Sequence, residues 1–322
     1  MTRSRSVALL AASLSISTGG ALAREYPQRP VRVLVGFAAG GTVDIVARLV
    51  MPKVAEALGQ TVIIDNRAGA SANIATELCA RAAPDGYTTL LVNPALAISA
   101  SAYRKLGYDA QRDLAPVGMV ANSSHLLIVH PSLPARSVKE LIALAKAKPG
   151  QLNFSSGGQG NADHLPGELL KSMTGIDIVH IPYKGGAPAA ADLIAGQVSM
   201  YFSGIAVGLP LVKAGRARGL AVTTKRRSPL APDMPTMDEA GVPGFETALW
   251  VGMFAPAGTP PAIVARLNTE IRKAVNAPDL RERLIAIGAV PFAGTPEELG
   301  VYLRNEIEKY GKVVRAIGLK ID

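Results

Sequence analysis

The sequence predicts an α/β protein of two lobes, a Venus flytrap fold of the periplasmic-binding-protein type, in which two doubly wound sheets are joined by two hinge crossings. Three observations lead to this class. Short apolar runs alternate with segments of helical apolar spacing to the end of the chain. The alternation falls into two series, separated by an apolar stretch that polar residues interrupt. A chain of 322 residues is also long enough for two domains of ordinary size.

The first strand, loop and helix form the unit around which we expect the site to lie. Val31–Val35 is a short, mostly β-branched run and predicts a buried strand. Gly40 and Gly41 predict a turn with positive φ, and Thr42 or Asp44 is expected to cap the helix that follows. A helix that starts at the carboxyl end of a strand presents free backbone N–H groups, so this crevice favours anions.

Further elements follow in order, and the first half is expected to form a parallel sheet. The stretch 117–129 predicts the first crossing between the lobes, and 247–254 predicts the return crossing. Strands are predicted at 61–65, 88–92, 152–155, 178–180, 198–202 and 219–223, and helices at 73–83, 138–148, 163–174, 187–195, 206–214, 261–275, 280–287 and 296–317.

The two crossings divide the chain into lobes. Residues 24–123 and 250–322 are expected to form the first lobe, and residues 124–249 the second. A cleft between two lobes is a favoured ligand site, and a two-stranded hinge near Asn122 and Trp250 allows it to close.

The first 23 residues have the pattern of a secretory signal peptide. Arg3 and Arg5 supply the basic start, Val7–Ile16 is a mostly apolar core too short to span a bilayer, and Ala21–Ala23 is an A-x-A cleavage site. We therefore expect cleavage after Ala23 and export to the periplasm.

Composition excludes several classes of function. Cys79 is the only cysteine, so no disulfide within the chain is possible, and we expect it to be a buried core residue. The net charge of +9 comes from dispersed residues with few aromatics, which argues against a nucleic-acid surface. The four histidines have no metal-ligand spacing and are expected to be structural, so no metal and no cofactor is predicted.

Two further glycine-rich loops follow predicted strands. Ser155–Asn161 repeats the geometry of the first loop in the second half of the chain, and Tyr183–Gly186 is a third loop of this kind. The first loop and the Ser155–Asn161 loop, one in each half of the chain, could instead both be plain tight turns between a strand and a helix. Facing each other across a cleft, they would hold a ligand with backbone N–H groups, hydroxyls and amides. The predicted ligand-binding residues are Phe37, Ala39, Gly40, Gly41, Thr42, Asn93, Ser156, Gly157, Asn161 and Tyr183.

Six motifs in order resemble the Bug (TctC-type) family of periplasmic solute-binding proteins, which serve tripartite tricarboxylate transporters. The resemblance covers essentially the whole chain after the signal peptide. It implies a carboxylate held between two lobes, largely by backbone N–H groups, hydroxyls and ordered waters. The motifs lie at Phe37–Arg48, Asn66–Ala70, Pro84–Thr88, Tyr183–Gly186, Asp192–Gly196 and Ala255–Pro260.

Three functions stay open at this point. The first is capture of a di- or tricarboxylate, an acidic amino acid or an aromatic acid for the membrane subunits of such a transporter. The second is a periplasmic sensor that presents its closed form to a sensor kinase. The third, an enzyme, is disfavoured because the sequence has no G-x-S-x-G nucleophile elbow, no G-x-x-x-x-G-K-[ST] phosphate loop, and no G-x-G-x-x-G after the first strand. A monomer is expected in each case.

Overall fold

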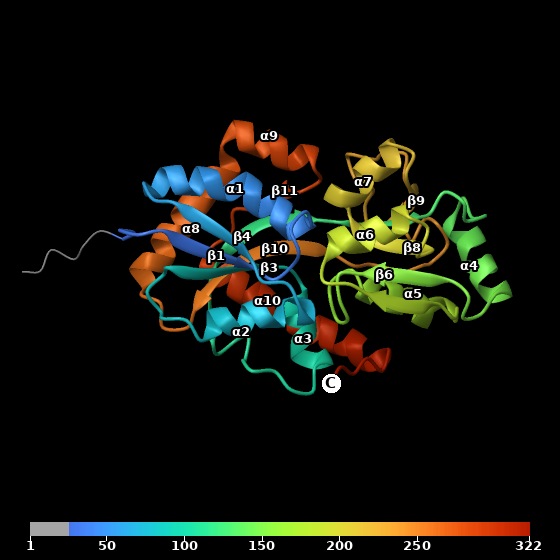
Figure 1. The fold of residues 1–322 in the computed structure, drawn as a ribbon, viewed down its shortest axis with the longest axis horizontal. Helices are drawn as coiled ribbons and strands as arrows, with labels where there is room; N and C mark the ends of the chain where they lie inside the picture. The colour runs from blue at the N-terminus through green and yellow to red at the C-terminus, as the bar shows by residue number, and fades with distance from the viewer. Residues whose placement is uncertain (1–25) are drawn as a thin grey trace, which may run out of the picture.

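The protein is described by a computed structural model that covers residues 26–322. The signal peptide predicted at 1–23 and its cleavage site lie outside these residues. Two α/β lobes lie side by side, each built on its own sheet (Figure 1). The two-lobed class predicted from the sequence is confirmed. No helix among residues 26–322 is both long and apolar enough to cross a membrane.

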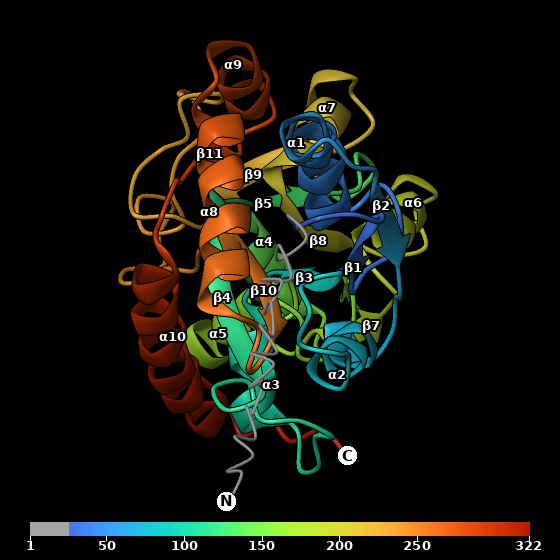
Figure 2. The ribbon, with the colours of Figure 1, turned by 90° about the vertical axis from the view of Figure 1, so that its left-hand side faces the viewer.

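Lobe 1 contains a six-stranded sheet with the order β11-β4-β10-β3-β1-β2. Helices α1 and α8 pack against each other, and α10 packs on α3 and β4, as the view along the lobe shows (Figure 2). Its elements are β1 (Val31–Val35), α1 (Thr42–Leu58), β2 (Val62–Asn66), η1 (Ala70–Ala72), α2 (Asn73–Ala80), β3 (Thr88–Val92), α3 (Ala95–Ala102), β4 (Leu114–Ser123), β10 (Leu249–Pro256), α8 (Pro261–Asn276), α9 (Pro278–Ala286), β11 (Val290–Pro291) and α10 (Pro296–Ala316).

Lobe 2 contains a five-stranded sheet with the order β7-β6-β8-β5-β9. Two apolar clusters cover its faces, one around Phe154 and Phe202 and the other around Leu126 and Ile128. Its elements are β5 (His125–Val129), α4 (Val138–Ala147), β6 (Asn153–Ser156), α5 (Leu165–Thr174), β7 (Val179–Pro182), α6 (Gly186–Ile194), β8 (Met200–Gly204), α7 (Ile205–Lys213) and β9 (Arg218–Val222).

The parallel sheet expected for the first half of the chain is confirmed for β1, β2 and β3, whereas each complete sheet is mixed. Strands β1, β2 and β3 pair in parallel, but β10 is antiparallel to β3 and β4, and β5 is antiparallel to β8 and β9. The reason is the direction in which each strand enters its sheet. Strands β5 and β10 follow a crossing from the other lobe, so they begin at the cleft. Strands β3 and β8 end at the cleft, so β5 and β10 run antiparallel to them.

Two local predictions need correction. Residues 95–102 form a helix, α3, that the sequence reading missed, because its apolar residues surround the whole helix and show no one-sided pattern. Helix α1 has Gly41 as its N-cap and no side-chain cap bond, so neither Thr42 nor Asp44 caps it. Pro52 lies inside α1, and the helix continues past it to Leu58.

Candidate ligand-binding site

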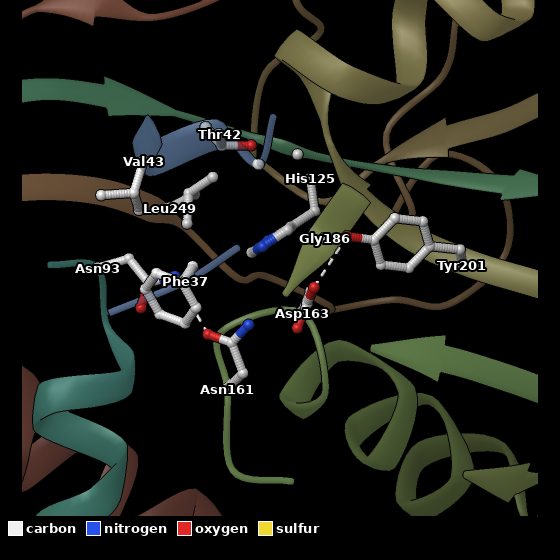
Figure 3. Close-up of a pocket in the computed structure, with 12 residues that line it drawn as sticks. Phe37, Thr42, Val43, Asn93, His125, Asn161, Asp163, Gly186, Tyr201 and Leu249 are labelled. Carbon is white, nitrogen blue, oxygen red and sulfur yellow. Dashed lines mark hydrogen bonds between the residues drawn. The ribbon is translucent and has the colours of Figure 1, made fainter. Parts of the chain in front are cut away.

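A small cavity lies between the two lobes, where β3 and α1 of lobe 1 face β5, β8 and α6 of lobe 2 (Figure 3). Its volume is about 30 Å³, which is room for roughly two water molecules. The residues that line it are Phe37, Gly41, Thr42, Val43, Asn93, His125, Asn161, Asp163, Gly186, Tyr201, Gly204 and Leu249.

The first loop is held by the carboxylate of Asp44. Its oxygens accept the N–H of Gly40 at 2.8 Å, Nε of Arg48 at 2.8 Å and Nδ2 of Asn66 at 2.9 Å. Desolvation of this buried carboxyl raises its pKa, but the three partners outweigh that effect and hold the pKa below its ordinary value of 3.8. Asp44 and Arg48 also form an ion pair along the helix, and the N–H of Gly40 is turned inward rather than toward the cleft.

Only one of the two glycines in the turn has the backbone conformation that was expected. Gly40 has φ 81°, in the left-handed region, whereas Gly41 has φ −80° and ψ 166° and is extended. The reason is that Gly41 is already the N-cap of α1, and N-cap residues adopt extended backbone.

Helix N-termini from both lobes meet at the cavity. Thr42 and Val43 are the first residues of α1, and Gly186 is the first residue of α6. The first N–H groups of a helix have no partner within the helix, and the helix dipole favours an anion there. The side-chain amide of Asn93 adds a polar wall, and its Nδ2 donates to Oδ1 of Asn161 at 3.1 Å across the two lobes.

The second loop is organised around a buried acid, Asp163. Its two carboxylate oxygens accept the N–H of Gly157 at 3.0 and 2.9 Å, and Oδ2 also accepts the hydroxyl of Tyr201 at 2.9 Å. Burial raises the pKa of Asp163 from 3.8 to about 6. The N–H of Gly157 is thus already occupied, in the same way as that of Gly40 in the first loop.

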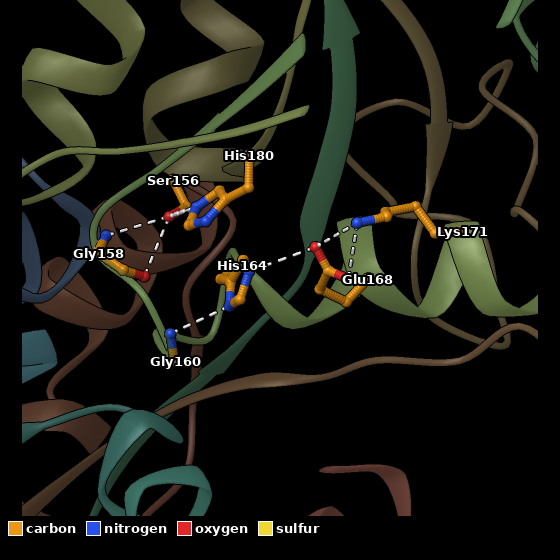
Figure 4. Close-up of polar contacts among 7 residues, drawn as sticks. All are labelled: Ser156, Gly158, Gly160, His164, Glu168, Lys171 and His180. Atoms are coloured by element: carbon orange, nitrogen blue, oxygen red, sulfur yellow. Dashed lines mark hydrogen bonds and ion pairs between the residues drawn. The ribbon is translucent and has the colours of Figure 1, made fainter. Parts of the chain in front are cut away.

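Two stacked imidazoles support the same loop from behind (Figure 4). Nε2 of His180 lies 2.6 Å from Oγ of Ser156, and the N–H of Gly160 donates to Nδ1 of His164 at 3.0 Å. The ring centroids of the two histidines are 3.8 Å apart. Desolvation by burial, with a contribution from His164, lowers the pKa of His180 to about 3. The role predicted for these two histidines was structural, and these contacts are of that kind.

The structure brings five of the predicted binding residues to the cavity and places the other five outside its lining. Phe37, Gly41, Thr42, Asn93 and Asn161 line it. The other five are outside its lining: Gly40, Gly157 and Ser156 make the contacts given above, Tyr183 donates to Asp192 at 2.5 Å, and Ala39 lies in the exposed part of the first loop.

Sequence reasoning did not find the remaining lining residues, Val43, His125, Asp163, Gly186, Tyr201, Gly204 and Leu249. His125 and Leu249 begin the two strands that enter from the opposite lobe, so the antiparallel entry of β5 and β10 places them at the cleft. The polar interruption at residues 122–125 marked a crossing and was a usable signal for His125. Nothing in the local pattern of β8 distinguishes Tyr201 from an ordinary core residue.

Contacts across the cleft hold the lobes together. The N–H of Ala38 donates to the carbonyl of Lys184 at 3.2 Å, and Oγ of Ser71 donates to the carbonyl of Gln159 at 2.7 Å. A Cβ on Gly185 would lie 2.8 Å from the nitrogen of Ala38, so only glycine lets the lobes approach this closely.

Metal and thiol chemistry have no visible place in residues 26–322. No group of three His, Cys, Asp or Glu side chains among them is arranged to hold a metal ion. Cys79 is buried in the core of lobe 1, as predicted, and burial raises its pKa to about 12.

Comparison with known proteins gives the family. The family model described as "Tripartite tricarboxylate transporter family receptor" matches residues 46–319. Protein BugT of Bordetella pertussis is 37% identical over 298 residues, which are 92% of this chain and 91% of BugT. A protein from the tcbD-tcbE intergenic region of Pseudomonas sp. strain P51 is 39% identical over 290 residues, 90% of this chain and 86% of that protein.

Solved structures agree with this. The structure titled "R. palustris Rpa4515 with adipate" has a TM-score of 0.90 at 40% identity and covers 92% of this chain and 99% of that chain. Periplasmic binding protein BugD has a TM-score of 0.89 at 34% identity, with 92% and 99% covered. MatC from Rhodopseudomonas palustris with bound malate has a TM-score of 0.87 at 33% identity, with 90% and 100% covered. The chain therefore belongs to the tripartite tricarboxylate transporter receptor family, known as TctC or Bug, and is a periplasmic solute-binding protein of that family.

Proposed function

We propose that this protein captures a small carboxylate in the cleft between its lobes and delivers it to the membrane subunits of a tripartite tricarboxylate transporter. The observation that carries the proposal is the meeting of the N-termini of α1 and α6 at one cavity, with Asn93 and Asn161 beside them. Adipate and malate, the ligands named with two similar structures, are both dicarboxylates.

The proposed chemistry is capture by hydrogen bonds, without a reaction. One carboxylate docks on the start of α1, with the hydroxyl of Thr42 and the N–H groups of the first turn as donors. Asn161 and the start of α6 receive the other end. Phe37, Val43 and Leu249 pack on the carbon chain between the two ends. Of the loop residues predicted from the sequence, we propose that Ala39, Gly40, Ser156, Gly157 and Tyr183 shape the cleft around these contacts.

The cavity of about 30 Å³ is too small for a dicarboxylate, so binding requires the lobes to separate and close again around the ligand. We propose hinges at the two crossings, with residues 24–123 and 250–322 in one lobe and 124–249 in the other. β4 ends at Ser123, β5 begins at His125 and β10 begins at Leu249, next to these boundaries. The protein then works as a monomer, exported after cleavage at Ala23.

A thermal-shift screen with adipate, malate, citrate, glutamate and benzoate tests the proposal. A ligand present at about one hundred times its dissociation constant adds roughly 2.7 kcal/mol of stability, which raises Tm by several degrees. The matched control for each hit is the corresponding amide or methyl ester, which keeps the carbon chain but lacks the charge. If no acid raises Tm more than its control, carboxylate capture is wrong. Hydrolysis of the esters would point to an enzyme instead.

A further inference from the structure

The imidazole of His125 is a buried base in the cleft, and its Nδ1 takes part in no hydrogen bond among the described residues. His125 is 1% exposed, and this nitrogen is itself buried. Figure 3 shows its imidazole extending from the start of β5 into the space framed by Phe37, Leu249 and Asp163. Buried polar atoms are nearly always satisfied, so an unpartnered nitrogen on a side chain that lines a ligand cavity indicates a partner that enters from outside.

Charge balance gives the nature of that partner. Among the described residues that line the cavity there is no lysine or arginine, and the lining carries one acid, Asp163. An anionic ligand would be placed beside this buried carboxyl, and two like charges in a dry site repel strongly. His125 is the one base in the cavity lining that can supply a compensating positive charge.

The other titratable groups around His125 have partners within the fold. Asp44 on α1 is paired with Arg48, and Tyr201 on β8 donates to Asp163. Lys184, in the loop before α6, is exposed and does not line the cavity. Both carboxylate oxygens of Asp163 already accept hydrogen bonds from Gly157 and Tyr201, so this carboxyl has partners within the fold, whereas His125 has none.

We propose that His125 is the proton-accepting ligand contact of the cleft: its imidazole takes up a proton when a carboxylate binds and pairs with it as imidazolium. This inference rests on the proposed function and adds a proton to the species captured. In the ligand-free protein, burial lowers the pKa of His125 to about 3, so the ring is neutral there. A carboxylate at hydrogen-bond distance raises the pKa of such a base by about one to three units, and the upper end applies in a buried site because the low dielectric constant there strengthens the pairing.

The consequence is an affinity that increases as the pH falls. With the pKa of His125 near 3 in the free protein and about three units higher in the complex, binding should be about tenfold tighter at pH 5 than at pH 7.5 through this group alone. Protonation of the ligand and of Asp163 also changes over this range. The measured quantity is therefore the ratio of the dissociation constants of His125→Asn and wild type, in which those contributions cancel.

The experiment is isothermal titration calorimetry of the full mature protein with adipate, malate, citrate, glutamate and benzoate, in two buffers of different ionisation enthalpy. At pH 6, wild type should take up about half a proton more than His125→Asn, and the affinity ratio should grow about tenfold from pH 7.5 to pH 5. The matched control is His130→Asn, because His130 follows the same strand but contacts Ser132 at the surface. It should behave as wild type.

Each alternative result is decisive. Binding of a carboxylate without proton uptake overturns the inference and leaves the proposed function standing. Uptake that persists in His125→Asn and disappears in Asp163→Asn assigns the proton to Asp163 and also overturns it. Binding of none of the five acids refutes both. If His125→Asn does not fold, imidazole ¹⁵N spectra of wild type at pH 5.5 decide: one histidine must change from neutral to cationic on addition of the ligand, and no change refutes the inference.

Discussion

Gly40 and Gly41 are neighbours in the first loop but depend on glycine for different reasons. The backbone at Gly40 has φ 81°, and an L-residue held in this left-handed conformation costs roughly 1–2 kcal/mol. A Cβ on Gly41 would meet the carbonyl of Ala38 at 3.5 Å and the nitrogen of Gly186 at 3.7 Å, both ordinary contacts. We therefore predict that Gly40→Ala lowers the free energy of unfolding by about 1–2 kcal/mol, measured by urea denaturation.

Gly41→Ala is the matched control for this prediction. It should leave the free energy of unfolding within about 0.5 kcal/mol of wild type, although its methyl group faces the start of α6 at the cavity. Equal losses for both variants would contradict the difference in backbone conformation between the two positions.

At the scale of elements, the second loop is supported by His180 in its neutral form. His180 has a pKa of about 3 in the folded protein and 6.5 ordinarily. The unfolded chain therefore binds the extra proton between these values, and stability is present above pH 6.5 and lost as the pH falls toward 3. At pH 5 this loss is roughly 2 kcal/mol. His125, with its pKa also lowered to about 3, acts with the same sign, and Asp163, with its pKa raised to about 6, acts with the opposite sign.

The quantity to compare is the difference in Tm between His180→Asn and wild type, because the contributions of His125 and Asp163 to the pH dependence are the same in both proteins. His180→Asn should have a lower Tm than wild type at pH 7.5, because it loses the stacking on His164 and the contact with Ser156. The gap between the two Tm values should narrow by several degrees at pH 5. Thermal melts followed by circular dichroism over this pH range provide the measurement, and a gap that stays constant would show that protonation of His180 is not coupled to unfolding.

At the scale of the whole molecule, a strained segment of lobe 1 holds the rim of the cleft. Ala70, Ser71 and Ala72 have φ 45°, 52° and 73°, three consecutive left-handed residues without glycine. Such strain persists only where surrounding contacts hold it, and the bond from Ser71 to Gln159 crosses the cleft. Ser71→Ala should weaken the closed form and reduce ligand affinity by about 2–10-fold, the range expected for one hydrogen bond.

Two measurements test this rim contact, using the carboxylate that gives the largest thermal shift. Calorimetry gives the loss of affinity, and small-angle scattering shows whether the radius still decreases when ligand is added. Ser132→Ala, on the outer surface of lobe 2, is the control and should change neither. If Ser71→Ala binds as wild type does, the contact between Ser71 and Gln159 does not contribute to closure.

The sequence by itself determined the features that depend on local pattern. Val31–Val35 and Thr88–Val92 were predicted with their observed bounds, because short apolar runs between turns identify strands. The last helix was predicted to begin at residue 296, as it does, and Thr295 before it forms a complete capping box with Glu298. The two lobes were also predicted, because the alternation of apolar runs and helical segments falls into two series separated by interrupted apolar stretches.

Only the tertiary structure decided how the site is assembled. His125 and Leu249 reach the cavity because their strands enter from the opposite lobe, and strand direction is not visible in an apolar run. The N–H of Gly40 donates to Asp44 in lobe 1, and the N–H of Gly157 donates to Asp163 in lobe 2, so neither is available to a ligand. Which donors remain for a ligand is set by contacts between distant residues, so glycine loops could be located from the sequence but their free N–H groups could not.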